Sequence, residues 1–151
     1  MNRKLLNRKG FTLIELLVVI GVLAVLLAIV LVAINPARQF AQANNTKRAS
    51  DVQALLNAVT QYAADNRGTL PTGITATATA IGSAGVDICS FIVPTYIAAL
   101  PVDPLTNNGT PIATCSGAYN TNYLISVSAT DQRITVSAPA AELSSVITVT
   151  R

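Results

Sequence analysis

The pattern of apolar and polar residues divides the chain into three parts, and the first is an apolar run. Residues 11–34 read FTLIELLVVIGVLAVLLAIVLVAI, with Glu15 as the one charged residue and Thr12 as the one other polar side chain. A helix of this length reaches about 36 Å, whereas the hydrocarbon core of a bilayer is about 30 Å thick. The run therefore predicts a membrane-spanning helix.

The second part, residues 35–67, has the pattern of an amphipathic helix. Pro36 is expected to kink the helix, which then resumes, and Asn66-Arg67-Gly68 is expected to end it. We therefore expect one kinked helix of about 55 residues, about 80 Å long, over both parts. Apolar residues at helical spacing form its core-facing stripe, namely Val52, Leu55, Leu56, Val59, Tyr62 and Ala63. Polar residues are expected on its other faces, namely Lys47, Arg48, Asp51, Asn57 and Gln61.

The third part, residues 68–151, predicts a globular head with a small antiparallel sheet. Residues 75–85, rich in Thr and Ala, are typical of an exposed loop. Residues 123–129 and 134–138 alternate apolar with polar positions around a short turn, which predicts a hairpin. Val146, Thr148 and Thr150 indicate a third, edge strand. One face of this sheet is expected to pack on the helical stripe, which gives an α+β fold.

Charge is concentrated at the start of the chain. Arg3, Lys4, Arg8 and Lys9 lie in residues 1–10, which hold no acid. The other six basic residues face seven acidic ones, a formal net charge of −1. The basic leader predicts a cytoplasmic N-terminus with the head on the outer side of the membrane. The acidic balance of the remainder argues against a nucleic-acid partner.

Catalytic chemistry is sparse. The chain has no histidine, which excludes Ser/His/Asp and Cys/His catalysis. Asp103, Asp131 and Glu142 stand singly among turn and strand residues, without the spacing of a carboxylate pair. We expect no enzyme, no cofactor and no metal.

Glu15 is the most informative residue of the apolar run. A carboxylate deep in a bilayer costs about 2.5–3.5 kcal/mol, and such residues usually have a partner or a function. Cleavage between Gly10 and Phe11 would create an α-amino group four residues away. That amine could neutralise the carboxylate of a neighbouring copy, so that pairing would favour association in register.

Two simpler interpretations of the apolar run remain. A secretory signal peptide has an apolar region of 7–15 residues and a small-residue cleavage site, which Leu31-Val32-Ala33 matches poorly. A plain uncleaved anchor fits the length of the run but does not explain Glu15.

Residues 8–16, RKGFTLIEL, resemble the class III signal of type IV pilins and type II secretion pseudopilins. The resemblance implies a pilin-like fold and cleavage after Gly10 by a membrane prepilin peptidase. It implies that Phe11 becomes N-methylphenylalanine and that Glu15 sets the register of subunits during assembly. Many type IV pilins have a proline at the position of Val32; here the first proline is Pro36.

The two cysteines, Cys89 and Cys115, lie 26 residues apart in segments expected to be loops. No C-x-x-C motif and no histidine indicates a metal or redox site. On the outer side of a membrane such a pair is expected to form a structural disulfide. Type IV pilins resemble the chain here too, because a disulfide bounds their variable region, whereas pseudopilins generally lack one.

Residues 100–104, LPVDP, resemble a loop of major pseudopilins, some of which bind calcium nearby. Asp103 is the one carboxylate close to this loop, whereas calcium requires several oxygen ligands. We expect ordinary turns here and no metal.

The functional hypothesis is a structural protein that polymerises. It divides the chain into a leader (1–10), a membrane and assembly helix (11–34), an amphipathic continuation (35–67) and a head (68–151). The resemblance implies a subunit of a type IV pilus that leaves the inner membrane for an extracellular filament of identical copies. Its implied partners are the prepilin peptidase, membrane lipid, an assembly platform and ATPases, since the chain has no P-loop of its own.

Three alternatives remain. One is a type II secretion pseudopilin in the periplasm, which the LPVDP loop favours, whereas the cysteines favour the pilin. Another is a minor or DNA-uptake pilin, against which the acidic remainder argues. From a different class, the third is a membrane-anchored extracytoplasmic binding domain with an uncleaved helix.

Overall fold

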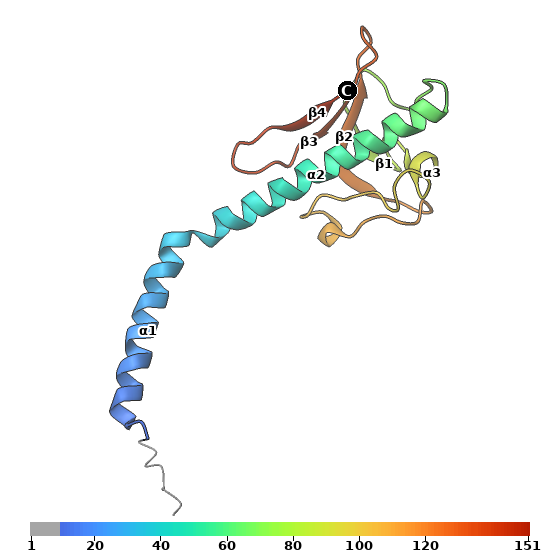
Figure 1. Cartoon of the computed structure of the whole chain (residues 1–151). Helices are drawn as coiled ribbons and strands as arrows, with labels where there is room; N and C mark the ends of the chain where they lie inside the picture. Colours follow the sequence, from blue (N-terminus) through green and yellow to red (C-terminus); the bar gives the residue numbers. More distant parts are fainter. Residues whose placement is uncertain (1–9) are drawn as a thin grey trace, which may run out of the picture. The chain divides into compact units, whose positions relative to one another are not determined.

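The computed structural model describes residues 10–151, which form two compact units along the chain. One unit ends at Gln39, and the other spans Phe40–Arg151; from here on we call this second unit, which includes most of the second helix, the head. The predicted leader lies outside the described residues except for Gly10. Figure 1 traces the chain through both units, coloured along the sequence.

The apolar run forms α1, Leu13–Ile34. The helix begins after Thr12, an N-cap residue in extended conformation, and ends at Asn35, which has φ 48° and ψ 78°. Asparagine tolerates this left-handed conformation, and the proline that follows disfavours helical geometry at the residue before it. A second helix, α2, therefore starts afresh at Pro36 and runs to Asp65. The expected interruption at Pro36 and the resumption after it are confirmed, but one left-handed residue divides the expected single kinked helix into two helices.

The predicted end of α2 is close to the observed one. Asp65 is its last residue, Arg67 has φ 55° and Gly68 has φ 87°. The N–H of Gly68 donates to the carbonyl of Ala63 at 2.7 Å, which satisfies one of the last helical carbonyls. Glycine fits this position because it adopts positive φ without a steric penalty.

The head contains one antiparallel sheet of four strands in the order β1-β2-β3-β4. The strands are β1 (Thr79–Gly82), β2 (Asn120–Val127), β3 (Ile134–Ala138) and β4 (Ile147–Thr150). The predicted hairpin is confirmed as β2 and β3, in which Ile125 lies opposite Val136. The third predicted strand is confirmed as β4 at one edge of the sheet.

The prediction of a loop throughout residues 75–85 is wrong, because β1 lies within it. Thr79 of β1 pairs with Ile125 of β2, far along the sequence. Ile81 is fully buried and is the one large apolar side chain of the segment. Long-range pairing and this single anchor make the strand, so the local composition gave no sign of it.

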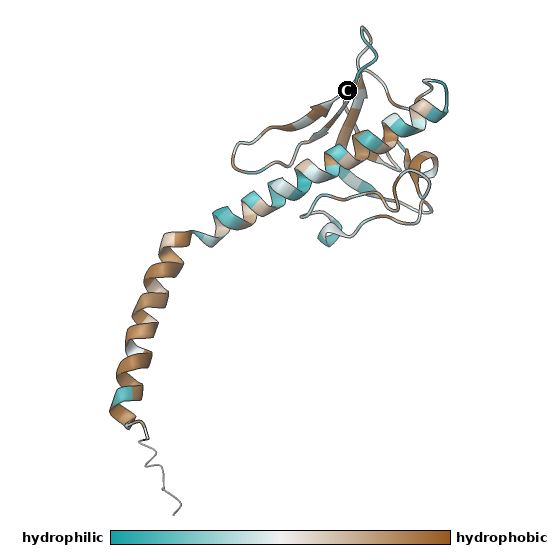
Figure 2. Cartoon of the chain, in the orientation of Figure 1, coloured by the Kyte–Doolittle hydropathy of each residue, from teal (hydrophilic) through white to brown (hydrophobic). Residues whose placement is uncertain are grey.

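The predicted stripe of α2 packs against the inner face of the sheet. Val52, Leu55 and Val59 are fully buried, and Tyr62 is half-buried at the margin. Alternate residues of the strands complete this core, namely Ile81, Tyr123, Ile125, Ile134 and Val136. Figure 2 shows the resulting alternation of polar and apolar residues along α2, which contrasts with α1, apolar along most of its length.

The connection between β1 and β2 carries two short helical turns, α3 (Cys89–Ile92) and η1 (Asn107–Gly109). The ring of Tyr62 meets those of Phe91 and Tyr96 edge to face, with centroids 5.7 and 5.8 Å away. This connection is therefore packed on the far end of α2.

Candidate functional site

The N-terminal end of α1 is closed by a reciprocal set of hydrogen bonds between Thr12 and Glu15. The Oε2 atom of Glu15 accepts from the backbone N–H of Thr12 at 2.8 Å and from its hydroxyl at 2.7 Å. The Thr12 hydroxyl oxygen in turn accepts the backbone N–H of Glu15 at 3.3 Å. This is a capping box, which satisfies N–H groups that the helix itself leaves without partners.

The capping box turns the Glu15 side chain back toward Gly10 and Phe11. Both bonds from Thr12 end on one carboxylate oxygen, and within residues 10–151 the other oxygen accepts none. The carboxylate therefore has one oxygen held in place and one available for a further donor. Thr12-x-x-Glu15 before an apolar run is the sequence signature of a capping box, so this arrangement could have been predicted but was not.

The residues predicted for processing lie immediately before the cap. Gly10 and Phe11 are exposed, with 87% of the Phe11 surface accessible. A Cβ atom built on Gly10 would meet no other atom within 4 Å. Gly10, Phe11 and Glu15 therefore share one accessible end of α1, as chain proximity requires.

The rest of α1 is apolar and exposed. None of its residues is buried in the described chain. Within residues 10–151, α1 is the one helix that is long and apolar enough to cross a membrane, judged by length and composition. The side chains of α1 therefore need lipid, or other copies of the helix, to remove them from water.

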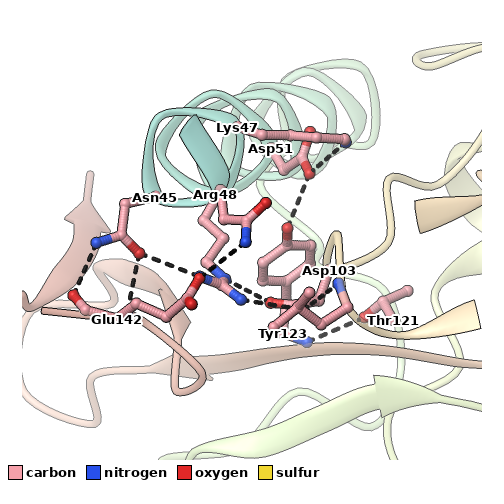
Figure 3. Close-up of polar contacts among 10 residues, drawn as sticks. Asn45, Lys47, Arg48, Asp51, Asp103, Thr121, Tyr123 and Glu142 are labelled. Carbon is pink, nitrogen blue, oxygen red and sulfur yellow. Dashed lines mark hydrogen bonds and ion pairs between the residues drawn. The ribbon is translucent and has the colours of Figure 1, made fainter. Parts of the chain in front are cut away.

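The head contains a second arrangement of polar residues, centred on Arg48 of α2 (Figure 3). Arg48 is fully buried, and its Nε donates to Oδ2 of Asp103 at 2.6 Å. Its Nη1 donates to Oε2 of Glu142 at 2.7 Å and to the side-chain oxygen of Asn45 at 3.1 Å. We call Asn45, Arg48, Asp103 and Glu142 the Arg48 cluster.

The Arg48 cluster joins three segments that are far apart in sequence: α2, the loop that contains Asp103, and the loop before β4. The hydrogen bonds that Arg48 donates to Asp103, more than the Coulombic attraction, raise the pKa of Arg48. Hydrogen bonds donated by Arg48 and then by Asn44 lower the pKa of Glu142. The cluster therefore keeps Arg48 and Glu142 ionised, and it fixes the loops of Asp103 and Glu142 against α2.

Two predictions fail at this cluster. Arg48 and Asp51 were expected on the polar faces of the helix, but both are buried. Asp103 and Glu142 were expected to stand alone, but both bind Arg48. The partners lie 55 and 94 residues from Arg48, so no local pattern could reveal them.

Asp51 is held by its own neighbours one turn further along α2. Its Oδ2 accepts from Lys47 Nζ and from the Tyr123 hydroxyl, both at 2.8 Å. Burial and then the hydrogen bond to Asp51 raise the pKa of Tyr123. The hydroxyl therefore stays protonated and ties β2 to α2 from inside the core.

The carboxylate of Asp103 is fully used by the protein. Its two oxygens accept from Arg48, and Oδ1 also accepts the backbone N–H of Leu105 at 2.9 Å. Within residues 10–151, no group of three or more acidic, cysteine or histidine side chains could hold a metal ion. A cation at this loop would have to displace a buried guanidinium, so the residues do not fit a calcium site.

The two cysteines are joined in a disulfide, with 5.5 Å between their Cα atoms. Cys89 begins α3 instead of lying in a loop, and it is fully buried in the core. Close by, the Tyr119 hydroxyl donates to Asp87 at 2.6 Å. The disulfide therefore fixes the long connection between β1 and β2 at both ends.

Comparison with known proteins gives a match at the N-terminal segment. No curated protein and no solved structure matches the chain. The family model described as the prokaryotic N-terminal methylation motif matches residues 5–31. The match supports the resemblance to type IV pilins and pseudopilins, whose precursors carry this motif. With the exposed apolar α1, the match supports a membrane-anchored precursor of the type IV pilin or pseudopilin kind.

Proposed function

We propose that the chain is a structural subunit of a type IV pilus, cut after Gly10 and N-methylated at Phe11. The observation that carries this proposal is the methylation motif on a helix whose apolar side chains are all exposed. A plain anchor needs the same apolar length but has no use for an acid in the first turn of the helix. A polymer of such helices uses both features.

Glu15 is the group that sets the stagger between neighbouring copies. Cleavage creates a positively charged amine at Phe11, and the capped Glu15 offers one carboxylate oxygen that accepts no bond from residues 10–151. An amine of a second copy at that oxygen would pair two charges that are each unfavourable in an apolar surrounding. Only one vertical offset between two copies brings these groups together, so the pairing fixes the register.

Assembly then moves α1 from lipid into a bundle of identical helices, with the heads on the outside. Head-to-tail contacts of this kind do not close, so they propagate as a fibre. The precursor waits in the inner membrane with its N-terminus on the cytoplasmic side, where the prepilin peptidase cuts it. An assembly platform and ATPases supply the work of extrusion, and the product is an extracellular filament.

A pseudopilin of a type II secretion system is the second candidate. The observation that favours it is the loop of residues 100–104, whose Asp103 is anchored on Arg48. The disulfide between Cys89 and Cys115 favours the pilus instead. Location separates the two, since a pilus can be sheared from the cell surface and a pseudopilus stays in the periplasm.

The test is to shear surface material from cells that produce the chain, to image it, and to sequence the N-terminus of its main band by mass spectrometry. The pilus proposal expects filaments built from a chain that begins with N-methyl-Phe11. Processed chain confined to the periplasm would instead support the pseudopilin. A chain that keeps residues 1–10 in the membrane would support the anchored binding domain and overturn both.

A further inference from the structure

The two edges of the head's sheet differ in their exposure to other strands. The outer side of β1 is covered by its own chain, because Ile81 forms a bridge with Val86. The N–H of Val86 donates to the carbonyl of Ala80 at 2.9 Å, and the N–H of Gly82 donates to the carbonyl of Val86 at 3.1 Å. The register of β1 also shifts between Ala80 and Gly82. The bridge to Val86 and the shift of register both hinder pairing of another strand at this edge.

The opposite edge, formed by β4, is open. Arg151 and Ile134 exchange both of their backbone hydrogen bonds, at 2.7 and 2.9 Å. Such pairs alternate along an antiparallel ladder, so Val149 and Ile147 also bond inward to β3. The N–H and carbonyl groups of Thr148 and Thr150 therefore point away from the sheet. Within residues 10–151, no segment pairs with that side (Figure 1).

The residues at this edge include no charged side chain, proline or glycine that would oppose pairing. Residues 146–150 read VITVT, five β-branched residues with no charge, no proline and no glycine. Val146 is 90% exposed, and Thr148 and Thr150 are exposed as well. Soluble proteins commonly protect an open edge with charge, proline or a bulge, and an uncharged β-branched edge is a template for another strand.

We propose that β4 pairs antiparallel with β4 of a second copy of this chain. A strand edge is completed by another strand edge, and within residues 10–151 the one edge of this sheet that remains open is β4 itself. Centring the pair on Thr148 lets Thr148 bond its own counterpart and places Val146 opposite Thr150. Ile147 then lies opposite Val149 on the face toward the core, so the apolar face of the sheet continues across the pair.

This contact is distinct from the contacts that build the proposed filament. A pair of identical edges related by a two-fold axis uses up both edges, so it closes and does not propagate. Between assembled filaments it would join two fibres side by side. It does not involve Glu15, so it can be tested in protein that is unable to polymerise.

A cysteine at the centre of the pair provides the test. Cys89 and Cys115 are bonded to each other, so Thr148→Cys introduces the one free thiol. Directly opposite residues in a hydrogen-bonded pair have Cα atoms about 5.5 Å apart, which a disulfide can bridge. The matched control is Ser137→Cys, on the neighbouring strand and the same sheet face but away from the edge. Mild oxidation of the full-length chain in detergent should give covalent dimers with Thr148→Cys and only background with Ser137→Cys.

A second pair of variants tests the same contact without a cross-link, by removing or keeping the backbone N–H of residue 148. Thr148→Pro removes an N–H that points outward and leaves the β3–β4 bonds in place, whereas Thr148→Val keeps that N–H. Sedimentation in detergent should show dimers for the parent chain and Thr148→Val, and monomers for Thr148→Pro. All samples also carry Glu15→Ala, so that a failure of filament assembly has no influence on the result. Cross-linking no greater than that of Ser137→Cys, or unchanged dimers with Thr148→Pro, would overturn the proposal.

Discussion

The helix α1 and the head distribute polar and apolar groups in opposite ways. Throughout α1 the apolar side chains are exposed and none is buried. In the head, the stripe of α2 is buried, and so are charged groups such as Arg48 and Asp103. The head satisfies its buried charges internally, through bonds as short as 2.6 Å.

This contrast separates the part of the chain that is complete alone from the part that is not. The head encloses its own core, with a disulfide and the Arg48 cluster to hold its long loops. By contrast, α1 has an apolar surface and a single acid, one oxygen of which accepts no bond within residues 10–151. Both features require surroundings that the described part of the chain does not provide. Changes in α1 should therefore alter processing and assembly, whereas changes in the head should alter stability.

Gly10→Leu should change processing of the N-terminal segment most strongly while leaving the stability of the head unchanged. The methylation motif implies a peptidase that needs a small residue before the cut, so cleavage should be abolished and full-length precursor should accumulate in the membrane. The unfolding midpoint of the head should not change. Gly21→Leu is the control, because it adds the same side chain to an open position of α1 and should leave cleavage intact. Normal cleavage of Gly10→Leu, measured by intact mass, would contradict the proposed processing site.

Arg48→Ala should have the largest effect within the head. It leaves the carboxylate of Asp103 buried without its cation, and breaking one side of a buried ion pair costs about 3–5 kcal/mol. Lys47→Ala is the control: Lys47 is 43% exposed and its pair with Asp51 contributes less than about 1 kcal/mol. Denaturant unfolding followed by circular dichroism measures both. Equal stability losses in the two variants would show that the Arg48 cluster is not a structural centre.

Removal of the disulfide should destabilise the head somewhat less. Cys89→Ser together with Cys115→Ser frees a loop of 26 residues, for which the chain-entropy estimate is about 3.5 kcal/mol. The same unfolding measurement applies, with the oxidised parent chain as reference. The helical signal of α1 should be unaffected, and its loss would show that the two units do not behave independently.

The smallest expected effect is a dependence of stability on acid pH through Glu142. Its pKa is lowered in the folded state, so its contribution is present above its ordinary pKa of about 4.5. This contribution is lost as the pH falls through the lowered value, because the unfolded chain then binds the proton more readily. Glu142→Gln should reduce the slope of stability against pH below 4.5 and leave α1 unaffected. Identical slopes for the variant and its parent would contradict this role.

The sequence was most informative where structure depends on neighbours along the chain. The apolar run, the stripe from Val52 to Val59 and the β2–β3 hairpin follow from local periodicity, and all three are confirmed. The break at Asn35 also has a local cause, the proline that follows it. A proline is compatible with a kinked helix and with two separate helices, so the sequence did not distinguish them. Of the candidate site, the motif at Gly10, Phe11 and Glu15 was readable because it is contiguous.

The features that escaped prediction all depend on partners distant in sequence. The strand β1 forms by pairing with β2 some 45 residues later, and Arg48 meets carboxylates 55 and 94 residues away. A polar residue on a helix gives no sign of whether it faces water or a buried acid. Only the fold decides that, because it places the loops of Asp103 and Glu142 against α2.

If Glu15 pairs with the Phe11 amine of a second copy, removal of its negative charge in Glu15→Gln should prevent assembly. Glutamine keeps a side-chain oxygen that can accept the bonds from Thr12 but removes the negative charge. Cleavage and N-methylation should be normal, but the amount of filament in sheared fractions should fall to a small fraction of the parent level. Filaments at the parent abundance, built from the processed Glu15→Gln chain, would contradict this pairing.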